Sequence, residues 1–135
     1  MSERQWTLPQ KKAITARGGD LLISAAAGSG KTAVLTERVL SLITDRENPV
    51  DIDRLLIVTF SNAAAEEMRQ RIAQRLYEKM EQEPENAALR RQSLLLGNAE
   101  ICTIHAFCYR LIRENFQVLG LPGDMQLGRE GENDL

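Results

Sequence analysis

The chain has 135 residues, a length that fits one ordinary domain. Seventeen Lys and Arg residues against 19 Asp and Glu residues give a formal net charge of −2, which excludes a histone-like protein but allows a local basic face. A hydrophobic content of 43% excludes gross disorder, no apolar run approaches the roughly 20 residues of a membrane span, and the start lacks the apolar core of a signal peptide.

The first third of the chain predicts a strand followed by a helix. Residues 20–25 form a short apolar run rich in β-forming residues after a Gly18-Gly19 turn signal, which predicts a buried strand. Residues 32–44 then place apolar side chains at helical spacing, ahead of Asn48-Pro49. Residues 54–60 predict a second buried strand, because four consecutive aliphatic residues leave neither face polar.

The remainder predicts three helices and a third strand. Ser61 or Asn62 caps a long helix with one apolar stripe, formed by Ala65, Met68, Ile72, Leu76 and Met80. We expect a shorter helix near residues 86–96, a strand over 100–104 and a last helix over about 105–119. Arginines mixed with glutamates indicate a solvated helix surface, namely Arg69, Arg71, Arg75, Arg90 and Arg91.

This order of elements indicates the α/β class, with parallel strands joined by helical crossovers. Three strands are too few for the usual doubly wound sheet. We therefore expect the architecture to be incomplete within these 135 residues.

The most informative stretch lies between the first strand and the first helix. It comprises Ala25, Ala26, Ala27, Gly28, Ser29, Gly30, Lys31 and Thr32. Small residues let backbone N–H groups curl around an anion, and the following helix directs the positive end of its dipole at the phosphates. Lys31 would contact the β- and γ-phosphates, and the Thr32 hydroxyl would bind the metal ion. The stretch therefore predicts a nucleotide-binding phosphate loop.

Ala25 departs from the strict form of this motif, which has glycine at that position. Alanine is the smallest replacement, so we expect a narrower range of backbone angles and a retained site. The alternative is a structural turn of small residues with a surface lysine. The motif and its position between a strand and a helix together favour nucleotide binding.

Three further segments resemble motifs of the UvrD/Rep-like superfamily 1 helicases. Residues 6–14 resemble the adenine-reading Q motif, residues 55–71 resemble motif Ia, and residues 103–107 resemble motif Ib. The triple alanine before the loop, residues 90–108 and residues 114–127 are similar to the N-terminus of AddA-like (RecB-like) helicase–nuclease subunits of bacterial double-strand-break repair. The resemblance covers nearly the whole chain.

The resemblance implies a fold, an activity and a set of ligands. Residues 1–135 would be the N-terminal part of a UvrD-like helicase ATP-binding domain, a P-loop NTPase with a RecA-like parallel sheet and flanking helices. ATP and Mg²⁺ would be the cofactors, with Lys31 and Thr32 catalytic and Gln10 hydrogen-bonded to adenine. The intact protein would be a 3′–5′ DNA helicase and exonuclease that acts on single- and double-stranded DNA beside an AddB-like subunit, without a membrane.

The same resemblance implies a path for single-stranded DNA at two strand ends. Its residues are Thr59, Phe60, Ser61, Asn62, Thr103 and His105. Helix-start N–H groups and hydroxyls suit phosphates, and an exposed Phe ring suits base stacking. The alternatives are that Phe60 closes the core, Asn62 only caps a helix and His105 is structural.

The only histidine and the two cysteines give poor support for a metal site. Cys102 and Cys108 offer no disulfide framework, so we expect buried, reduced thiols in a cytoplasmic protein.

The sequence has no strand that ends in the Asp-Glu pair that ATP hydrolysis needs, and no nuclease signature. We therefore expect an N-terminal piece that is inactive alone. The alternatives are a UvrD-like helicase without a nuclease and a nucleotide-binding module without turnover. A small P-loop kinase is disfavoured, because no lid or acceptor site is evident.

Overall fold

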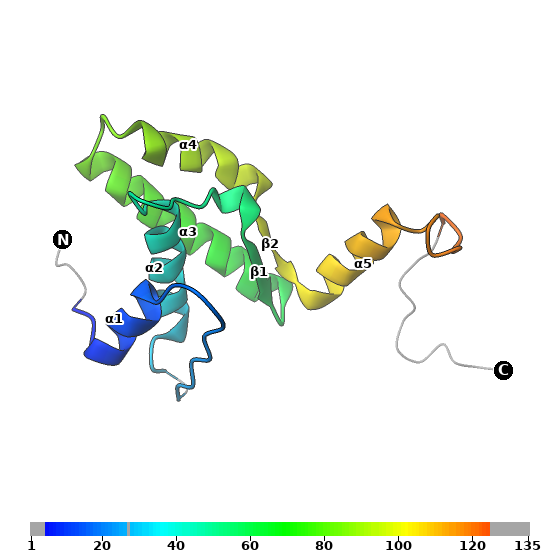
Figure 1. Cartoon of the computed structure of the whole chain (residues 1–135), viewed down its shortest axis with the longest axis horizontal. Helices are drawn as coiled ribbons and strands as arrows, with labels where there is room; N and C mark the ends of the chain where they lie inside the picture. Colours follow the sequence, from blue (N-terminus) through cyan, green and yellow to red (C-terminus); the bar gives the residue numbers. More distant parts are fainter. Residues whose placement is uncertain (1–4, 27, 125–135) are drawn as a thin grey trace.

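Five α-helices and two β-strands form in residues 5–26 and 28–124, the parts of the chain that the computed structural model describes (Figure 1). The helices are α1 (Leu8–Thr15), α2 (Lys31–Ile43), α3 (Asn62–Gln82), α4 (Ala87–Leu95) and α5 (Ile104–Glu114). The strands are β1 (Leu56–Thr59) and β2 (Glu100–Thr103), and the 3-10 turns η1 (Ile52–Arg54) and η2 (Leu96–Asn98) precede them. No helix in these parts of the chain is long and apolar enough to cross a membrane.

The two strands pair in parallel, in a register that runs from Leu56 opposite Glu100 to Thr59 opposite Thr103. The chain crosses from β1 to β2 through α3 and α4. One face of this small sheet buries Ile57 and Ile101 against α3. The predicted α/β class is confirmed, with a two-stranded parallel sheet in the described residues.

The predicted strand at residues 20–25 does not form. Residues 20–26 have no regular structure, and the side chains of Leu21, Leu22 and Ile23 are 45%, 94% and 43% exposed. A strand is stable only when its backbone groups pair with a neighbour, and neither β1 nor β2 pairs with this segment. Its composition favoured a strand, but the described residues give it no neighbouring strand.

The short helix α1 was not expected from the sequence. It begins with a capping box, in which the Thr7 side chain accepts from the Gln10 backbone and the Gln10 side chain accepts from the Thr7 backbone. Pro9 lies in its first turn, where its missing N–H costs nothing. Ala13 and Ile14 pack on Val34 of α2, with Trp6 at the edge of this small cluster.

The main core lies between α2, α3, α4 and the sheet. The predicted stripe of α3 is confirmed, because Ala65, Met68, Ile72 and Leu76 are buried and the half-buried Met80 packs against them. Ile72 and Ile52 are fully buried at its centre.

Helix α5 is shorter than expected and extends away from the main core (Figure 1). It ends at Glu114 instead of Leu119, because the Asn115 side chain donates to the Leu111 carbonyl at 2.8 Å and residues 115–120 turn. Gly120, with a φ of 65°, completes that turn.

Candidate nucleotide and nucleic-acid site

The described residues of the segment before α2 include two glycines with left-handed backbone conformation. Gly28 and Gly30 have φ values of 77° and 82°, the left-handed region that glycine adopts without steric cost. The Ser29 N–H donates to the Ala26 carbonyl at 3.2 Å and closes a turn between them. Ala27, which the motif also includes, lies outside the described residues.

The first turn of α2 is open to an anion. Its N-cap is Gly30, which has no side chain to occupy the first N–H groups of the helix. The loop residues that the structure describes, together with Lys31 and Thr32, are exposed apart from the half-buried Gly30. The positive end of the helix dipole and several N–H donors therefore face the outside at this point.

Lys31 and Thr32 stand at the start of this helix. The Lys31 Nζ donates to the Ala25 carbonyl at 3.2 Å, so the side chain reaches back across the loop. The Thr32 hydroxyl makes no hydrogen bond with the described residues, which leaves it free to bind a ligand-held metal ion. Within residues 5–26 and 28–124, no cluster of three or more His, Cys, Asp or Glu side chains could hold a metal ion by itself.

Gln10 joins α1 to the loop. Its Oε1 accepts from the Thr7 N–H at 2.9 Å, and its Nε2 donates to the Ser29 carbonyl at 3.3 Å. A primary amide has two donor and two acceptor sites. One donor and one acceptor of Gln10 therefore remain for a ligand beside the loop.

A second set of predicted residues meets at the carboxyl ends of β1 and β2. Thr59 and Thr103 are opposite each other in the register, and each strand leads into a helix. Ser61 caps α3 by accepting from the Ala64 N–H, and Thr103 caps α5 by accepting from the Ala106 N–H, both at 3.1 Å. Two helix N-termini thus lie beside the same strand ends, where open parallel sheets bind ligands.

Exposure separates the residues of this edge. The Phe60 side chain is 98% exposed, so the alternative that it closes the core is wrong. Asn62 and His105 are also exposed, whereas Thr103 is only 8% exposed and its hydroxyl already caps α5. A ligand at this edge would meet Phe60, Asn62 and His105 first.

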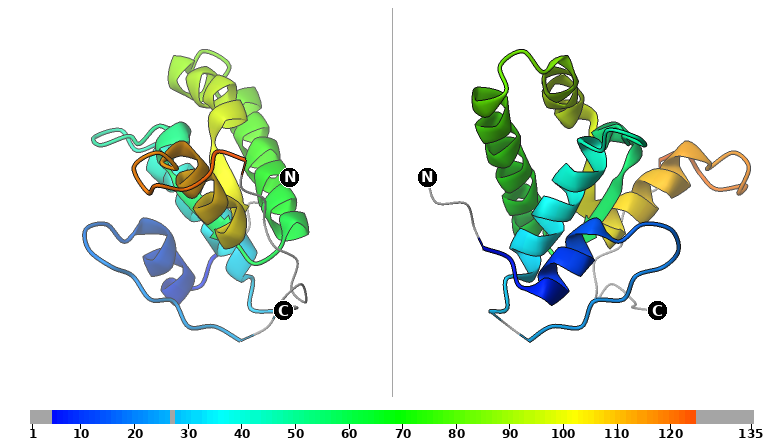
Figure 2. Two further views of the ribbon diagram at one scale, coloured as in Figure 1. Left: turned by 90° about the vertical axis from the view of Figure 1, so that its right-hand side faces the viewer. Right: turned by 60° about the vertical axis from the view of Figure 1, so that its left-hand side comes forward.

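Both candidate regions lie toward the same end of the molecule. Helices α2, α3 and α5 all begin at this end, which is the lower side of the main body in Figure 1 and in the right-hand view of Figure 2. The segment before α2 and the ends of β1 and β2 therefore lie on the same side of the main body.

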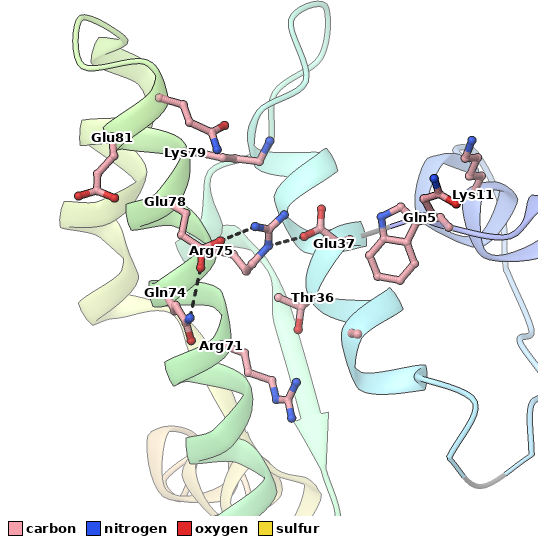
Figure 3. A pocket seen from close by; sticks show the side chains of 13 residues that line it. Gln5, Lys11, Thr36, Glu37, Arg71, Gln74, Arg75, Glu78, Lys79 and Glu81 are labelled. Atoms are coloured by element: carbon pink, nitrogen blue, oxygen red, sulfur yellow. Dashed lines mark hydrogen bonds and ion pairs between the residues drawn. The ribbon is translucent and has the colours of Figure 1, made fainter. Parts of the chain in front are cut away.

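A groove with a volume of about 990 Å³ lies elsewhere, between α2 and α3 (Figure 3). There Arg75 donates to Glu37 at 2.6 Å and also pairs with Glu78. The Glu37 hydrogen bond raises the pKa of Arg75, and the Arg75 hydrogen bond lowers the pKa of Glu78. The Arg75–Glu37 pair joins α3 to α2, whereas the Arg75–Glu78 pair lies within α3. Neither the described residues of the loop before α2 nor the strand ends line this groove.

Several interpretations of single residues change with the structure. Arg69 does not belong to a solvated surface, because its guanidinium donates to the carbonyls of Leu96, Ala99 and Ile101 at 3.1–3.4 Å. Arg71 and Arg91 do form surface ion pairs, with Glu67 and Asp51 respectively.

Both cysteines are free, but Cys108 is exposed and Cys102 is half-buried, so the expected burial is wrong. Cys108 is exposed because α5 extends away from the main core and buries none of its residues.

Two polar residues with structural roles were not identified from the sequence. Gln92 is buried, accepts from the Ile52 N–H at 2.9 Å and donates to Asp51 at 2.7 Å. Arg38 donates to the carbonyls of Ala13 and Ala16. For both Gln92 and Arg38, the signal in the sequence is a polar residue on the apolar side of a predicted helix.

Comparisons with known proteins show the family of this chain. The chain is 57% identical over 131 residues to the AddA subunit of the ATP-dependent helicase/nuclease of Thermoanaerobacter sp. (strain X514), a match that covers 97% of this chain and 11% of the relative. The proteins of the same name in Acetivibrio thermocellus and Clostridium novyi are 57% and 51% identical over 136 and 135 residues, again 11% of each relative. This chain thus spans about a tenth of the length of these relatives. Residues 6–134 match the family described as the UvrD/REP helicase N-terminal domain, and the chain belongs to that family.

Proposed function

We propose that this chain is the ATP-binding segment of an AddA-like, ATP-dependent DNA helicase–nuclease, the first part of a RecA-like motor domain. The observation that carries the proposal is the loop ahead of α2, with left-handed Gly28 and Gly30 and an uncapped helix start. The relatives are named as ATP-dependent helicase/nuclease proteins, which supports ATP as the proposed ligand of that loop.

The phosphates would bind at the start of α2. Backbone N–H groups and the Lys31 ammonium would hold the β- and γ-phosphates, and Lys31 would stabilise charge on the phosphoryl group during transfer. Lys31 would exchange its bond to the Ala25 carbonyl for the anion. Thr32 would bind the magnesium ion that accompanies ATP.

Adenine would bind at the free sites of the Gln10 amide. The N7 atom of adenine accepts a hydrogen bond and its N6 amino group donates one, and a Gln amide can pair with both. The two bonds that Gln10 makes to Thr7 and Ser29 leave one donor and one acceptor for this purpose. Guanine presents two acceptors along the same edge, so it would fit less well.

Single-stranded DNA would pass the ends of β1 and β2. Phe60 would stack on a base, and the starts of α3 and α5, with Ser61, Asn62 and His105, would face phosphates. Thr59 and Thr103 would shape this edge, since the Thr59 hydroxyl donates to the Ser61 carbonyl and Thr103 caps α5.

In the intact protein, ATP would lie between this segment and a second motor domain. Opening and closing of that cleft would move DNA with 3′–5′ polarity, in double-strand-break repair beside an AddB-like partner. The cytoplasmic location also stays a prediction.

The test is the Lys31→Ala variant of the intact protein. We expect ATP-driven unwinding to be abolished with the fold intact, because Lys31 is exposed and belongs to neither apolar cluster. Lys79→Ala, which removes a lysine of α3 that lines the groove, is the matched control. Unwinding by Lys31→Ala at the rate of the control would contradict the motor assignment.

A nucleotide-binding module without turnover is the second candidate. The observation in its favour is that β1 and β2 end in Thr59 and Thr103, where hydrolysis needs a carboxylate. Phosphate release from ATP, measured on the 135-residue chain, should therefore be undetectable. Magnesium-dependent release that disappears in Lys31→Ala would instead identify the chain as a complete enzyme.

A further inference from the structure

Helix α1 carries Gln10 but has little of its own to hold it in place. It has eight residues, too few for an isolated helix to be stable in water. Only Ala13 and Ile14 are buried, in a small cluster with Val34 of α2 and the half-buried Trp6. The position of α1 must therefore depend on other contacts.

Arg38 of α2 provides two of these contacts. One of its terminal nitrogens donates to the Ala13 carbonyl at 2.7 Å and to the Ala16 carbonyl at 2.8 Å. These carbonyls lie at the C-terminal end of α1, where backbone acceptors lack helical partners and the dipole favours a cation. The half-buried Arg38 thus ties the end of α1 to the middle of α2.

Arg17 completes the connection from the other side. It donates to the carbonyls of Ile14 and Ala16, both at 3.1 Å, and to the Ser41 hydroxyl of α2 at 2.6 Å. Two arginines thus bind the C-terminal end of α1 to α2. The proposed phosphate loop leads directly into the same helix α2.

We propose that Arg38 is a positioning residue for adenine recognition, which fixes α1 on α2 and thereby places the Gln10 amide beside the phosphate loop. This inference rests on the proposed function. Gln10 lies at the opposite end of α1 from Arg38, and its bond to Ser29 forms only if α1 keeps its orientation. The hydrogen bonds of Arg38 go to α1 and its C-cap and not to the described residues of the loop. Its loss should therefore change adenine recognition, through Gln10, more than phosphate binding.

The experiment compares three ligands on the 135-residue chain. Dissociation constants are measured by calorimetry for magnesium–ATP, magnesium–GTP and inorganic tripolyphosphate, on the wild type, Arg38→Met, Arg38→Lys and Gln10→Ala. Methionine keeps an apolar stem and removes the donors, whereas lysine keeps donors on one nitrogen, as Arg38 uses them. Arg46→Met is the matched control, because Arg46 is an exposed arginine after α2 that has no hydrogen bond or ion pair with the described residues.

A bidentate base contact gives about 5- to 150-fold discrimination, so the wild type should prefer ATP to GTP within that range. In Arg38→Met this ratio should fall toward one, while tripolyphosphate affinity changes by less than about fivefold, the value of one net hydrogen bond. Arg38→Lys should recover at least half of the lost preference, and Arg46→Met should keep all of it. Amide exchange at residues 11–14 should accelerate in Arg38→Met, with α3 unchanged.

The double variant, Arg38→Met with Gln10→Ala, separates positioning from general damage. If Arg38 acts through Gln10, the double variant has the same ATP-to-GTP ratio as Gln10→Ala alone. Three results would overturn the inference. Arg38→Met could keep the full preference for ATP, or Arg38→Lys could show no better ATP-to-GTP ratio than Arg38→Met. The double variant could also lose more of the preference than Gln10→Ala alone. A wild type that binds none of the three ligands would contradict the proposed function itself.

Discussion

Gly28 shows how much a phosphate loop depends on backbone conformation at one residue. Its φ is 77°, and a Cβ added there would meet no atom within 4 Å. An alanine would thus cause no collision, but it would disfavour the left-handed conformation by roughly 1–2 kcal/mol. The loop could then form only at that cost.

Gly28→Ala should therefore weaken magnesium–ATP binding about 5- to 30-fold, measured by equilibrium titration. Gly97→Ala is the control, since Gly97 also has open space around its Cα but no positive φ. Equal affinities in the two variants would show that the left-handed turn is not needed for binding.

Asp51 joins η1 to α4, and its charge should make stability depend on pH. Hydrogen bonds from Arg91 and Gln92 lower the pKa of its carboxyl to about 2. The folded pKa lies below the unfolded value of about 3.9, so this stabilisation is complete above pH 4 and is lost as pH falls through 2.

Between pH 5 and pH 2, the midpoint of urea unfolding should fall further for the wild type than for Asp51→Asn. Asp53→Asn is the control, because Asp53 is an exposed carboxyl of the same turn. Parallel curves for wild type and Asp51→Asn would contradict this role of Asp51.

Phe60 offers the clearest residue test of the proposed DNA edge. Because its ring is 98% exposed, Phe60→Ala should leave the free energy of unfolding unchanged within about 0.5 kcal/mol. Loss of base stacking costs about 1–3 kcal/mol per base, or about 5- to 150-fold in affinity for single-stranded oligothymidine, measured by fluorescence anisotropy. Leu94→Ala removes another exposed apolar side chain, on α4, and should change neither quantity. Unchanged DNA affinity in Phe60→Ala would remove the base-stacking role.

At the scale of elements, α3 organises the molecule. Its buried stripe packs on α2, α4 and the sheet, and its first turn forms part of the strand-end edge. Ile72 lies fully buried at the centre of this stripe, so truncation of its side chain would leave a cavity inside the core.

Ile72→Ala should lower the free energy of unfolding by about 2–5 kcal/mol, measured by urea denaturation. Gln70→Ala, on the exposed side of the same helix, should change it by less than about 0.5 kcal/mol. Similar losses in both variants would mean that the stripe does not form the core.

The elements that the sequence predicted correctly are those with local signals. The apolar period of α3, the aliphatic run of β1 and the cap residue Ser61 each act within a few residues. Residues 20–25 failed because a strand also needs a partner, which composition cannot specify. Helix α1 was missed although the Thr7 and Gln10 capping box was legible, because its eight residues contain too few apolar positions for a period.

The sequence predicts which residues belong to the candidate site, but it does not predict the hydrogen bonds that join distant parts of the chain there. Glycines, Lys31 and Thr32 follow a fixed order, so their pattern alone predicts a phosphate loop, which stays a prediction. The bonds of Gln10 to Ser29 and of Arg38 to Ala13 join parts of the chain that are 19 and 25 residues apart. No local pattern encodes such contacts.

As a whole, the molecule leaves apolar surface beside its sheet. Leu56 and Val58 of β1 are 47% and 43% exposed, on the face opposite the buried Ile57. Parallel strands are normally covered on both faces. The proposed phosphate loop, in contrast, comprises the start of α2 and the segment before it, so we do not expect it to depend on that face being covered.

The central claim is that residues 25–32 form a phosphate site, and a titration of the 135-residue chain with a fluorescent ATP analogue and magnesium tests it most directly. We predict saturable binding that unlabelled ATP displaces, with at least tenfold weaker affinity in Lys31→Ala and unchanged affinity in Lys79→Ala. The absence of saturable binding, or the same affinity in Lys31→Ala as in the wild type, would contradict the claim.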